Sequence, residues 1–156
     1  MYTEILVPYD GSESSHKALT AAIQLAVDPR PVTITVLQVT NADDTDKTSF
    51  EIAMRMAGLK EDSDRIKLLS DETLATFKEQ TRKKIEEYFS SLPENVSVKI
   101  VVKRGDPRNV IVDYAKENGT DCIIMGRRGI TGIRASLGSV STAILRNTDL
   151  PVMVVK

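Results

Sequence analysis

The residues best suited to binding chemistry lie in one segment, Met125–Ser141, whose sequence is MGRRGITGIRASLGSVS. The segment follows a short apolar run, and its last residues, Gly138–Ser141, are expected to begin a helix. Small residues there leave the first backbone N–H groups of the helix accessible, and the helix dipole gives them a positive potential. The arginines of the segment, among them Arg128, can add positive charge. The pattern favours a site for a phosphate group, with a plain strand-to-helix connection as the alternative.

The segment Pro8–Ser14, with the sequence PYDGSES, contains a second candidate group. Asp10 directly follows the first apolar run, Gly11 permits a tight turn, and Ser12 is suited to cap a helix. The Asp10 carboxylate is expected to contact a ribose hydroxyl or a metal ion held by a polyphosphate. Capping of the following helix is the alternative role.

Groups that could carry out catalysis are scarce in this sequence. His16 is the one histidine of the chain, and inside a predicted helix we expect it to be solvated or capping rather than a general base. Cys122 lies in an apolar run and is expected to be a small buried side chain, not a nucleophile. No group of His, Cys and carboxylate residues has the spacing of metal ligands. These features favour a binding protein over a dedicated enzyme.

The composition argues against several classes of partner. The formal net charge is -1, the isoelectric point is about 5.9, and aromatic residues make up 4% of the chain with no tryptophan. A nucleic-acid-binding surface is therefore not expected. No apolar run approaches the roughly 20 residues of a membrane span, and the first residues do not resemble a signal peptide, so we expect a cytoplasmic protein. Without a visible linker or repeat, residues 1–156 are expected to form a single domain.

Apolar and amphipathic runs predict the elements that must position these residues. Five runs rich in Val, Ile and Leu are predicted strands: Glu4–Pro8, Val32–Val39, Val96–Val102, Asp121–Met125 and Pro151–Val155. The first, fourth and fifth are almost continuously apolar, as in strands covered on both faces, whereas the other two indicate a more exposed position. The predicted helices are Ser12–Val27, Ser70–Leu92, Pro107–Asn118 and Gly138–Asn147.

The alternation of strands and helices predicts a parallel sheet with helices on both faces. Ligands of such sheets bind beyond the carboxyl ends of the strands, where the strand order reverses, and this rule selects the loops with Asp10 and Gly126–Ser139. The long, acid-rich insertion Thr40–Leu69 is expected to be a surface loop, and a flap over a site or a partner surface is the alternative. Within it, a short helix ending at Gly58 is predicted from the spacing of Phe50, Ala53, Met54 and Ala57.

With both loops in place, the chain resembles the universal stress protein family over essentially its whole length. The matching stretches are ILVPYDGSESSHKAL near the start, GDPRNVIVDYAKENGTDCIIMGRRG before the glycine loop, and LGSVSTAILRNTDLPVMVVK at the end. The resemblance implies an open five-stranded parallel sheet of strand order 3-2-1-4-5 with helices on both faces, a Rossmann-like α/β fold. It also implies a homodimer that pairs through the last strand, Pro151–Val155.

One branch of that family binds ATP through the pattern Gly-x2-Gly-x9-Gly-Ser/Thr. Gly126 and Gly129 match its start and Gly138-Ser139 its end, with eight residues, Ile130–Leu137, in place of nine. The resemblance implies ATP and Mg²⁺ as ligands, with Asp10 contacting the ribose or the metal ion. It implies the following nucleotide-binding residues: Pro8, Asp10, Val39 (at the adenine), Met125, Gly126, Arg128, Gly129, and Gly138, Ser139, Val140 and Ser141 around the phosphates.

The leading hypothesis is therefore a cytoplasmic ATP-binding stress protein that senses or stores nucleotide and signals through its dimer. A slow ATPase that uses Asp10-bound Mg²⁺ is one alternative. The other is a nucleotide-free stress protein that acts only by dimerisation, which the shortened glycine loop favours.

Overall fold

The computed structural model describes residues 2–26, 29–40, 63–128 and 137–156, and these form a five-stranded sheet flanked by helices. The strands are β1 (Glu4–Pro8), β2 (Val32–Thr40), β3 (Val96–Arg104), β4 (Cys122–Gly126) and β5 (Val152–Val155). Every neighbouring pair is parallel, and the strand order is β3-β2-β1-β4-β5. The predicted sheet and its strand order are confirmed.

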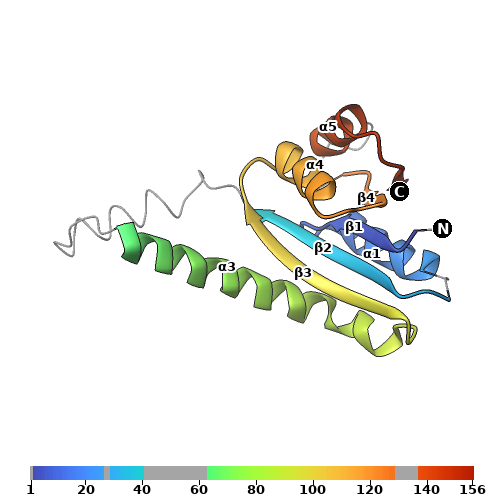
Figure 1. Cartoon of the computed structure of the whole chain (residues 1–156), viewed down its shortest axis with the longest axis horizontal. Helices are drawn as coiled ribbons and strands as arrows, with labels where there is room; N and C mark the ends of the chain where they lie inside the picture. The colour runs from blue at the N-terminus through green and yellow to red at the C-terminus, as the bar shows by residue number, and fades with distance from the viewer. Residues whose placement is uncertain (1, 27–28, 41–62, 129–136) are drawn as a thin grey trace.

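Helices cover both faces of the sheet (Figure 1). They are α1 (Glu13–Leu25), α3 (Ser63–Ile85), the short 3-10 helix η1 (Glu86–Ser91), α4 (Pro107–Glu117) and α5 (Ser139–Asn147). Leu19 of α1 and Ile85 of α3 are buried in one apolar cluster with residues of β1 and β2. Ile111 of α4 and Ile144 of α5 are buried in a second cluster with Leu6 of β1. The chain is therefore a doubly wound α/β fold with two separate apolar cores.

Helix caps fix where the elements after β1 and β3 begin. The Ser12 hydroxyl accepts the Ser15 N–H at 3.2 Å and so caps α1, as the sequence predicts. At the start of α4, the Asp106 carboxylate accepts a hydrogen bond from the Arg108 N–H at 2.9 Å. Pro107 occupies the first turn of the helix, where a backbone N–H has no intrahelical acceptor, so its lack of an N–H costs no hydrogen bond. Both caps lie at the carboxyl ends of their strands, so they set the direction in which each helix leaves the sheet.

For the helix predicted over Ser70–Leu92, both predicted ends were wrong. The helix α3 begins at Ser63, and its last turn continues into η1 rather than into a regular helix. Residues 64–69 are mostly good helix formers, so their intrinsic preference carries the helix past Ser70, where the sequence SDET has the capping signature of a helix start. The short helix predicted around Phe50 lies outside the described residues. Among those that are described, no helix is both long and apolar enough to cross a membrane.

The sequence predicts that the fifth strand is covered on both faces, and this prediction was wrong. Within the described residues, β5 pairs with β4 alone and forms an edge of the sheet, with Met153 40% exposed. A short apolar run fits a central strand and an edge strand equally well, because periodicity reports burial of side chains and not the number of partner strands. β3 forms the opposite edge, in agreement with its partly alternating sequence.

Candidate functional site

The strand order reverses at β1, and this reversal creates the crevice in which the two candidate loops meet. β1 lies between β2 and β4. The chain leaves β1 toward the face that carries α1, and it leaves β4 toward the opposite face, where α5 packs. Loops that diverge in this way leave a gap at the carboxyl ends of the two strands, which is the usual ligand position in open α/β sheets.

The loop after β1 holds Asp10 at the surface of this crevice. The Tyr9 N–H donates to the Leu37 carbonyl at 2.9 Å and so extends the sheet by one residue. Gly11 then adopts a φ of +79°, which side chains disfavour, and the turn brings the Ser12 N–H to Asp10 Oδ1 at 3.0 Å. Asp10 therefore shapes the entry to α1, although Ser12 itself is the cap. Its carboxylate remains exposed at the strand end.

The loop after β4 is bound to the start of α5 by several hydrogen bonds. The Gly138 N–H donates to the Arg127 carbonyl at 3.0 Å, and the Ser141 hydroxyl donates to the Gly126 carbonyl at 3.1 Å. The Ser12 hydroxyl lies 3.5 Å from the Arg128 carbonyl and links this loop to the first one. The structure thus brings Asp10, Gly126, Arg128 and the start of α5 together, as the sequence predicts.

Ser141 has a structural role that the sequence did not reveal. Its side chain is buried, and its hydroxyl also lies 3.3 Å from the Arg127 carbonyl. Through these contacts the hydroxyl holds α5 against the loop after β4. The backbone N–H is then the group of Ser141 that remains as a donor at the start of α5. Ser139, in contrast, has an exposed side chain. Of the two predicted hydroxyl contacts, only Ser139 has its hydroxyl accessible to a ligand.

Packing of α1 against β4 requires a residue without a side chain at Gly126. A Cβ atom there would lie 2.5 Å from the Ser14 Cβ and 2.7 Å from the Ser14 carbonyl oxygen. Its φ is not positive, and its close neighbour is the first turn of α1 rather than a turn of its own loop. The glycine at this position therefore explains how β4 and α1 approach each other.

Gly138 has a different environment from Gly126. It is the N-cap of α5, with a φ of −63° that any residue can adopt and no side-chain hydrogen bond to the helix. A Cβ atom at Gly138 would meet the Arg127 carbonyl oxygen at 3.4 Å, which is an ordinary contact. Nothing in the described part of the chain requires glycine here, and the first amides of α5 lack intrahelical acceptors. These amides are therefore candidate donors to an anionic ligand.

The other predicted residues lie around the same crevice. Pro8 ends β1 and pairs with Leu37, and Val39 lies near the end of β2, partly buried against the core. Met125 is buried in that core, so its side chain packs among apolar residues. Gly129 lies outside the described residues.

One cation near the crevice was missed by sequence reasoning. A Cβ atom at Gly11 would lie 3.7 Å from Lys84 Nζ, which places the ammonium group of α3 beside the Asp10 turn. The two positions are 73 residues apart, and α3 carries several exposed lysines, so no local pattern distinguishes this one. Only the path of α3 across the sheet brings Lys84 here.

His16 lies between two tyrosines and is not solvated or capping, contrary to expectation. Its Nε2 lies 2.9 Å from the Tyr9 hydroxyl, and its Nδ1 lies 3.3 Å from the Tyr88 hydroxyl. Burial, followed by the nearby Tyr88 and Asp10, raises the pKa of Tyr9 to about 12. The chain of polar contacts joins β1, α1 and η1 behind the Asp10 loop. Since Tyr88 is distant in sequence, its part in this contact follows only from the fold.

Neither a metal centre nor a reactive thiol is found among the residues that the structure describes. No three His, Cys, Asp or Glu residues of that set are grouped to hold an ion. Cys122 is buried, as predicted, and burial together with the nearby Asp121 raises the pKa of its thiol to about 11. At neutral pH the group is a thiol rather than a thiolate, so it is a poor nucleophile.

The fold and this crevice define a Rossmann-like α/β protein. At the point where the strand order reverses, it has a helix, α5, whose amino terminus is not capped by a side chain. The sequence profile described as "Universal stress protein family" matches residues 1–156, so the chain belongs to the universal stress protein family. The family implied by the sequence motifs is confirmed.

Relatives of known name agree with this assignment. The chain is 28% identical to universal stress protein YxiE of Bacillus subtilis, with 100% of both chains covered. The solved structure of MJ0577 of Methanocaldococcus jannaschii is similar with a TM-score of 0.71 at 27% identity, covering 100% of this chain and 96% of that one. The solved structure of universal stress protein UspA of Lactobacillus plantarum is similar with a TM-score of 0.70 at 25% identity, and the match covers 99% of this chain and 98% of that one.

Proposed function

We propose that this protein binds ATP, carried with Mg²⁺, in the crevice between the β1–α1 and β4–α5 loops. The observation that carries the proposal is the start of α5, where no side chain caps the helix and the first-turn amides lack intrahelical acceptors. Backbone amides and a helix dipole at that position suit a phosphate group. The Arg128 backbone carbonyl lies 3.5 Å from the Ser12 hydroxyl and the Lys84 ammonium group lies beside Gly11, so both residues are candidates to add positive charge.

An adenine nucleotide is the ligand to test first. Two solved structures with the same fold, at TM-scores of 0.58, are a universal stress protein in complex with cAMP and an Arabidopsis thaliana family member with AMP bound. The phosphates would lie at Gly138, Ser139, Val140 and Ser141, chiefly against backbone amides, with the Ser139 hydroxyl as a further donor. Pro8, Val39, Met125 and Gly126 would line the base and ribose region, with Gly129 completing the loop.

The residues present fit Mg²⁺ that arrives with the nucleotide rather than a resident metal ion. Asp10 offers one exposed carboxylate, whose Oδ1 already accepts the Ser12 N–H. Mg²⁺ usually keeps several waters and takes one or two carboxylates together with substrate phosphates. When bound, the ion would neutralise phosphate charge, and Asp10 would hold it or the ribose at the strand end.

We favour a binding module for stress signalling over an enzyme. Phosphoryl transfer to water needs a group that positions the attacking molecule. His16, the obvious candidate, has both ring nitrogens within hydrogen-bond distance of tyrosine hydroxyls. We therefore propose a cytoplasmic stress-response role in which the occupied and empty states of the crevice differ in signalling.

Isothermal titration with ATP and Mg²⁺ tests the site. Asp10→Asn should weaken binding of ATP-Mg by about tenfold but leave binding of ATP without Mg²⁺ nearly unchanged, because the lost charge acts through the metal ion. Asp113→Asn, an exposed carboxylate on α4, is the matched control and should behave like the wild type. Absence of binding at millimolar ATP would favour the nucleotide-free alternative. Release of ADP that stops in Asp10→Asn would favour the slow ATPase.

The edge strand β5 supports a further part of the proposal, a homodimer. In the part of the chain that the structure describes, its backbone has a partner strand on one side, and Met153 is exposed at the other edge. An unpaired edge with an apolar side chain is suited to pairing with the same strand of a second copy. Dimerisation here would leave the nucleotide crevice open.

A further inference from the structure

A groove runs between α3 and the free edge of β3. β3 ends the sheet on this side, so within the described residues one edge of its backbone has no partner strand. The groove is lined by every residue from Val96 to Lys103. Since alternate residues of a strand point to opposite faces, only a groove along the edge of the strand can be lined by all of them.

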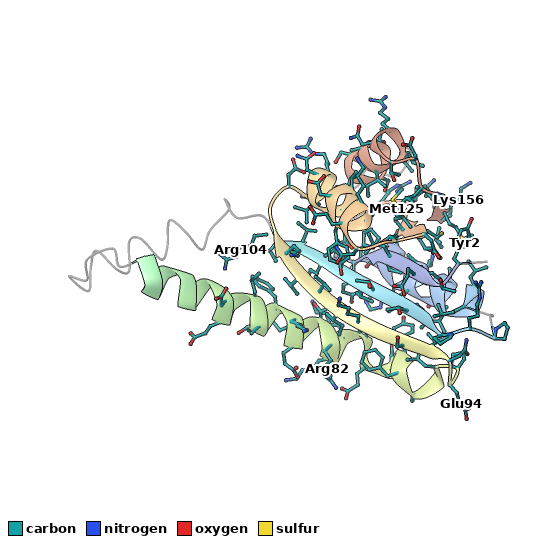
Figure 2. All side chains as sticks on the ribbon, in the orientation of Figure 1. Tyr2, Arg82, Glu94, Arg104, Met125 and Lys156 are labelled. Atoms are coloured by element: carbon teal, nitrogen blue, oxygen red, sulfur yellow. The ribbon has the colours of Figure 1, made fainter. Side chains whose placement is uncertain are left out.

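The opposite wall of the groove is one face of α3. It is formed by Leu74, Ala75, Lys78, Glu79 and Arg82, which recur at helical spacing, and Phe89 and Leu92 complete the lining. The volume is about 930 Å³, within the range of pockets that hold sizeable ligands. Figure 2 shows Glu94 just before β3 and Arg104 at its end, with α3 lying along the strand between them. A helix beside an unpaired strand edge is the geometry in which an extended peptide can add a strand.

The two faces of β3 give the groove two different chemical sides. Val98 and Ile100 pack against the apolar core shared with α1 and α3. Lys99 and Lys103 alternate with them, point to the other face and are exposed. An added strand would therefore meet the apolar side chains of β3 on the α3 side, where Lys78 and Arg82 also lie, and the ammonium groups of β3 on the other.

The charges of the groove select the partner. Four cations, Lys78, Arg82, Lys99 and Lys103, line it together with a single carboxylate, Glu79. Within the described part of the chain, none of the four forms an ion pair. A second copy of this strand would bring its own lysines against these, and like charges on neighbouring strands repel. The edge is therefore protected against pairing with itself but open to an acidic strand.

We propose that the edge of β3 binds an extended acidic segment of another protein, which joins the sheet as an additional strand. The segment alternates apolar and acidic residues. Its apolar side chains lie against Val98, Ile100 and Phe89, and its carboxylates lie beside Lys99 and Lys103. Main-chain hydrogen bonds to β3 provide the register, and the lysines provide the preference for acidic sequences. At its Lys103 end this site adjoins Val39, which pairs with Lys103 in the sheet and which we assign to the nucleotide, whereas Lys99 pairs with Thr35.

Fluorescence anisotropy with labelled eight-residue peptides tests the proposal. A Glu-Val alternating peptide should bind at least tenfold more tightly than a Lys-Val peptide of the same pattern. Strand addition uses the N–H of every second peptide residue, so N-methylation of one alternate set should abolish binding while methylation of the other set preserves it. Equal binding of the acidic and basic peptides would overturn the proposal. So would equal binding of both methylated forms, or tighter binding of a single-stranded oligonucleotide than of the acidic peptide.

Charge-reversal variants locate the site on the protein. Lys99→Glu and Lys103→Glu should each weaken binding of the Glu-Val peptide about tenfold. Lys116→Glu, at an exposed position on α4, is the matched control and should leave it unchanged. Peptide binding should also slow amide hydrogen exchange in β3 but not in α4. An equal loss in the control variant, or protection confined to other elements, would show that the peptide binds elsewhere.

Discussion

Gly126 and Ser14 approach so closely that a Cβ atom on the glycine would lie 2.5 Å from the Ser14 Cβ. Gly126 ends β4, and Ser14 belongs to the first turn of α1, which follows β1. The contact sets the distance between the two halves of the crevice. It also explains a glycine at a position where the sequence alone indicates only a ligand-binding loop.

Gly126→Ala should destabilise the fold. The new methyl group meets the Ser14 backbone as well as its side chain, with 2.7 Å to the carbonyl carbon and oxygen, so the helix must shift rather than a side chain rotate. Overpacking of this kind costs about 1–3 kcal/mol of unfolding free energy. Urea unfolding of the variant measures the loss. Ser14→Gly combined with Gly126→Ala should restore only part of it, because the backbone contacts persist; full restoration would contradict the explanation.

Much of this fold could be predicted because the local signals agree with the tertiary structure. β1 has its predicted bounds, Ser12 caps α1, and Pro107 begins α4, since each depends on residues within a few positions. The start of α3 could not be predicted in this way, because two signals compete there, helix preference before Ser70 and a capping signature at it.

The candidate site could be predicted only in outline. Motifs placed Asp10, Gly126 and Gly138 in one crevice, since the carboxyl ends of parallel strands share an edge. The separate roles of Gly126 and Gly138, the buried hydroxyl of Ser141 and the position of Lys84 each depend on a neighbour far away in sequence. Such contacts are properties of packing, and a single sequence contains no local signal for them.

Gly138→Ser should preserve the fold and weaken nucleotide binding. Serine is a preferred N-cap, and its hydroxyl accepts a hydrogen bond from the same first-turn amides that we assign to phosphate. The free energy of unfolding should stay equal or rise by a few tenths of a kcal/mol, while the affinity for ATP-Mg should fall at least tenfold. Asp106→Ser places the same residue at the N-cap of α4 and should leave ATP binding unchanged. Unaltered affinity of Gly138→Ser, measured by titration calorimetry, would move the phosphate away from α5.

Met153→Asp should convert the proposed homodimer to a monomer. Met153 is 40% exposed on the edge strand β5, whereas Val152 and Val154 pack partly against the core, so a charge at Met153 disturbs pairing with little effect on folding. Leu145→Asp on α5 is the matched control, since Leu145 is 44% exposed but lies on a helix. Multi-angle light scattering should give a dimer for the wild type and the control. A monomeric wild type, or a monomeric control, would argue against pairing through β5.

Alkaline pH should destabilise the protein partly through Tyr9. The folded pKa of Tyr9 is raised from 10.0 to about 12 by burial first, with Tyr88 and Asp10 adding to it. Between these values the unfolded chain releases the phenolic proton and the folded chain keeps it, so the unfolded state binds fewer protons and stability falls as pH rises from 10 to 12. Tyr9→Phe cannot ionise, so its unfolding free energy should fall less steeply over that range, although loss of the contact with His16 lowers its stability at neutral pH. Tyr2→Phe changes an exposed tyrosine and should follow the wild-type curve. Urea unfolding at several pH values gives the slopes, and parallel slopes for the wild type and Tyr9→Phe would mean that Tyr9 ionises equally easily in both states.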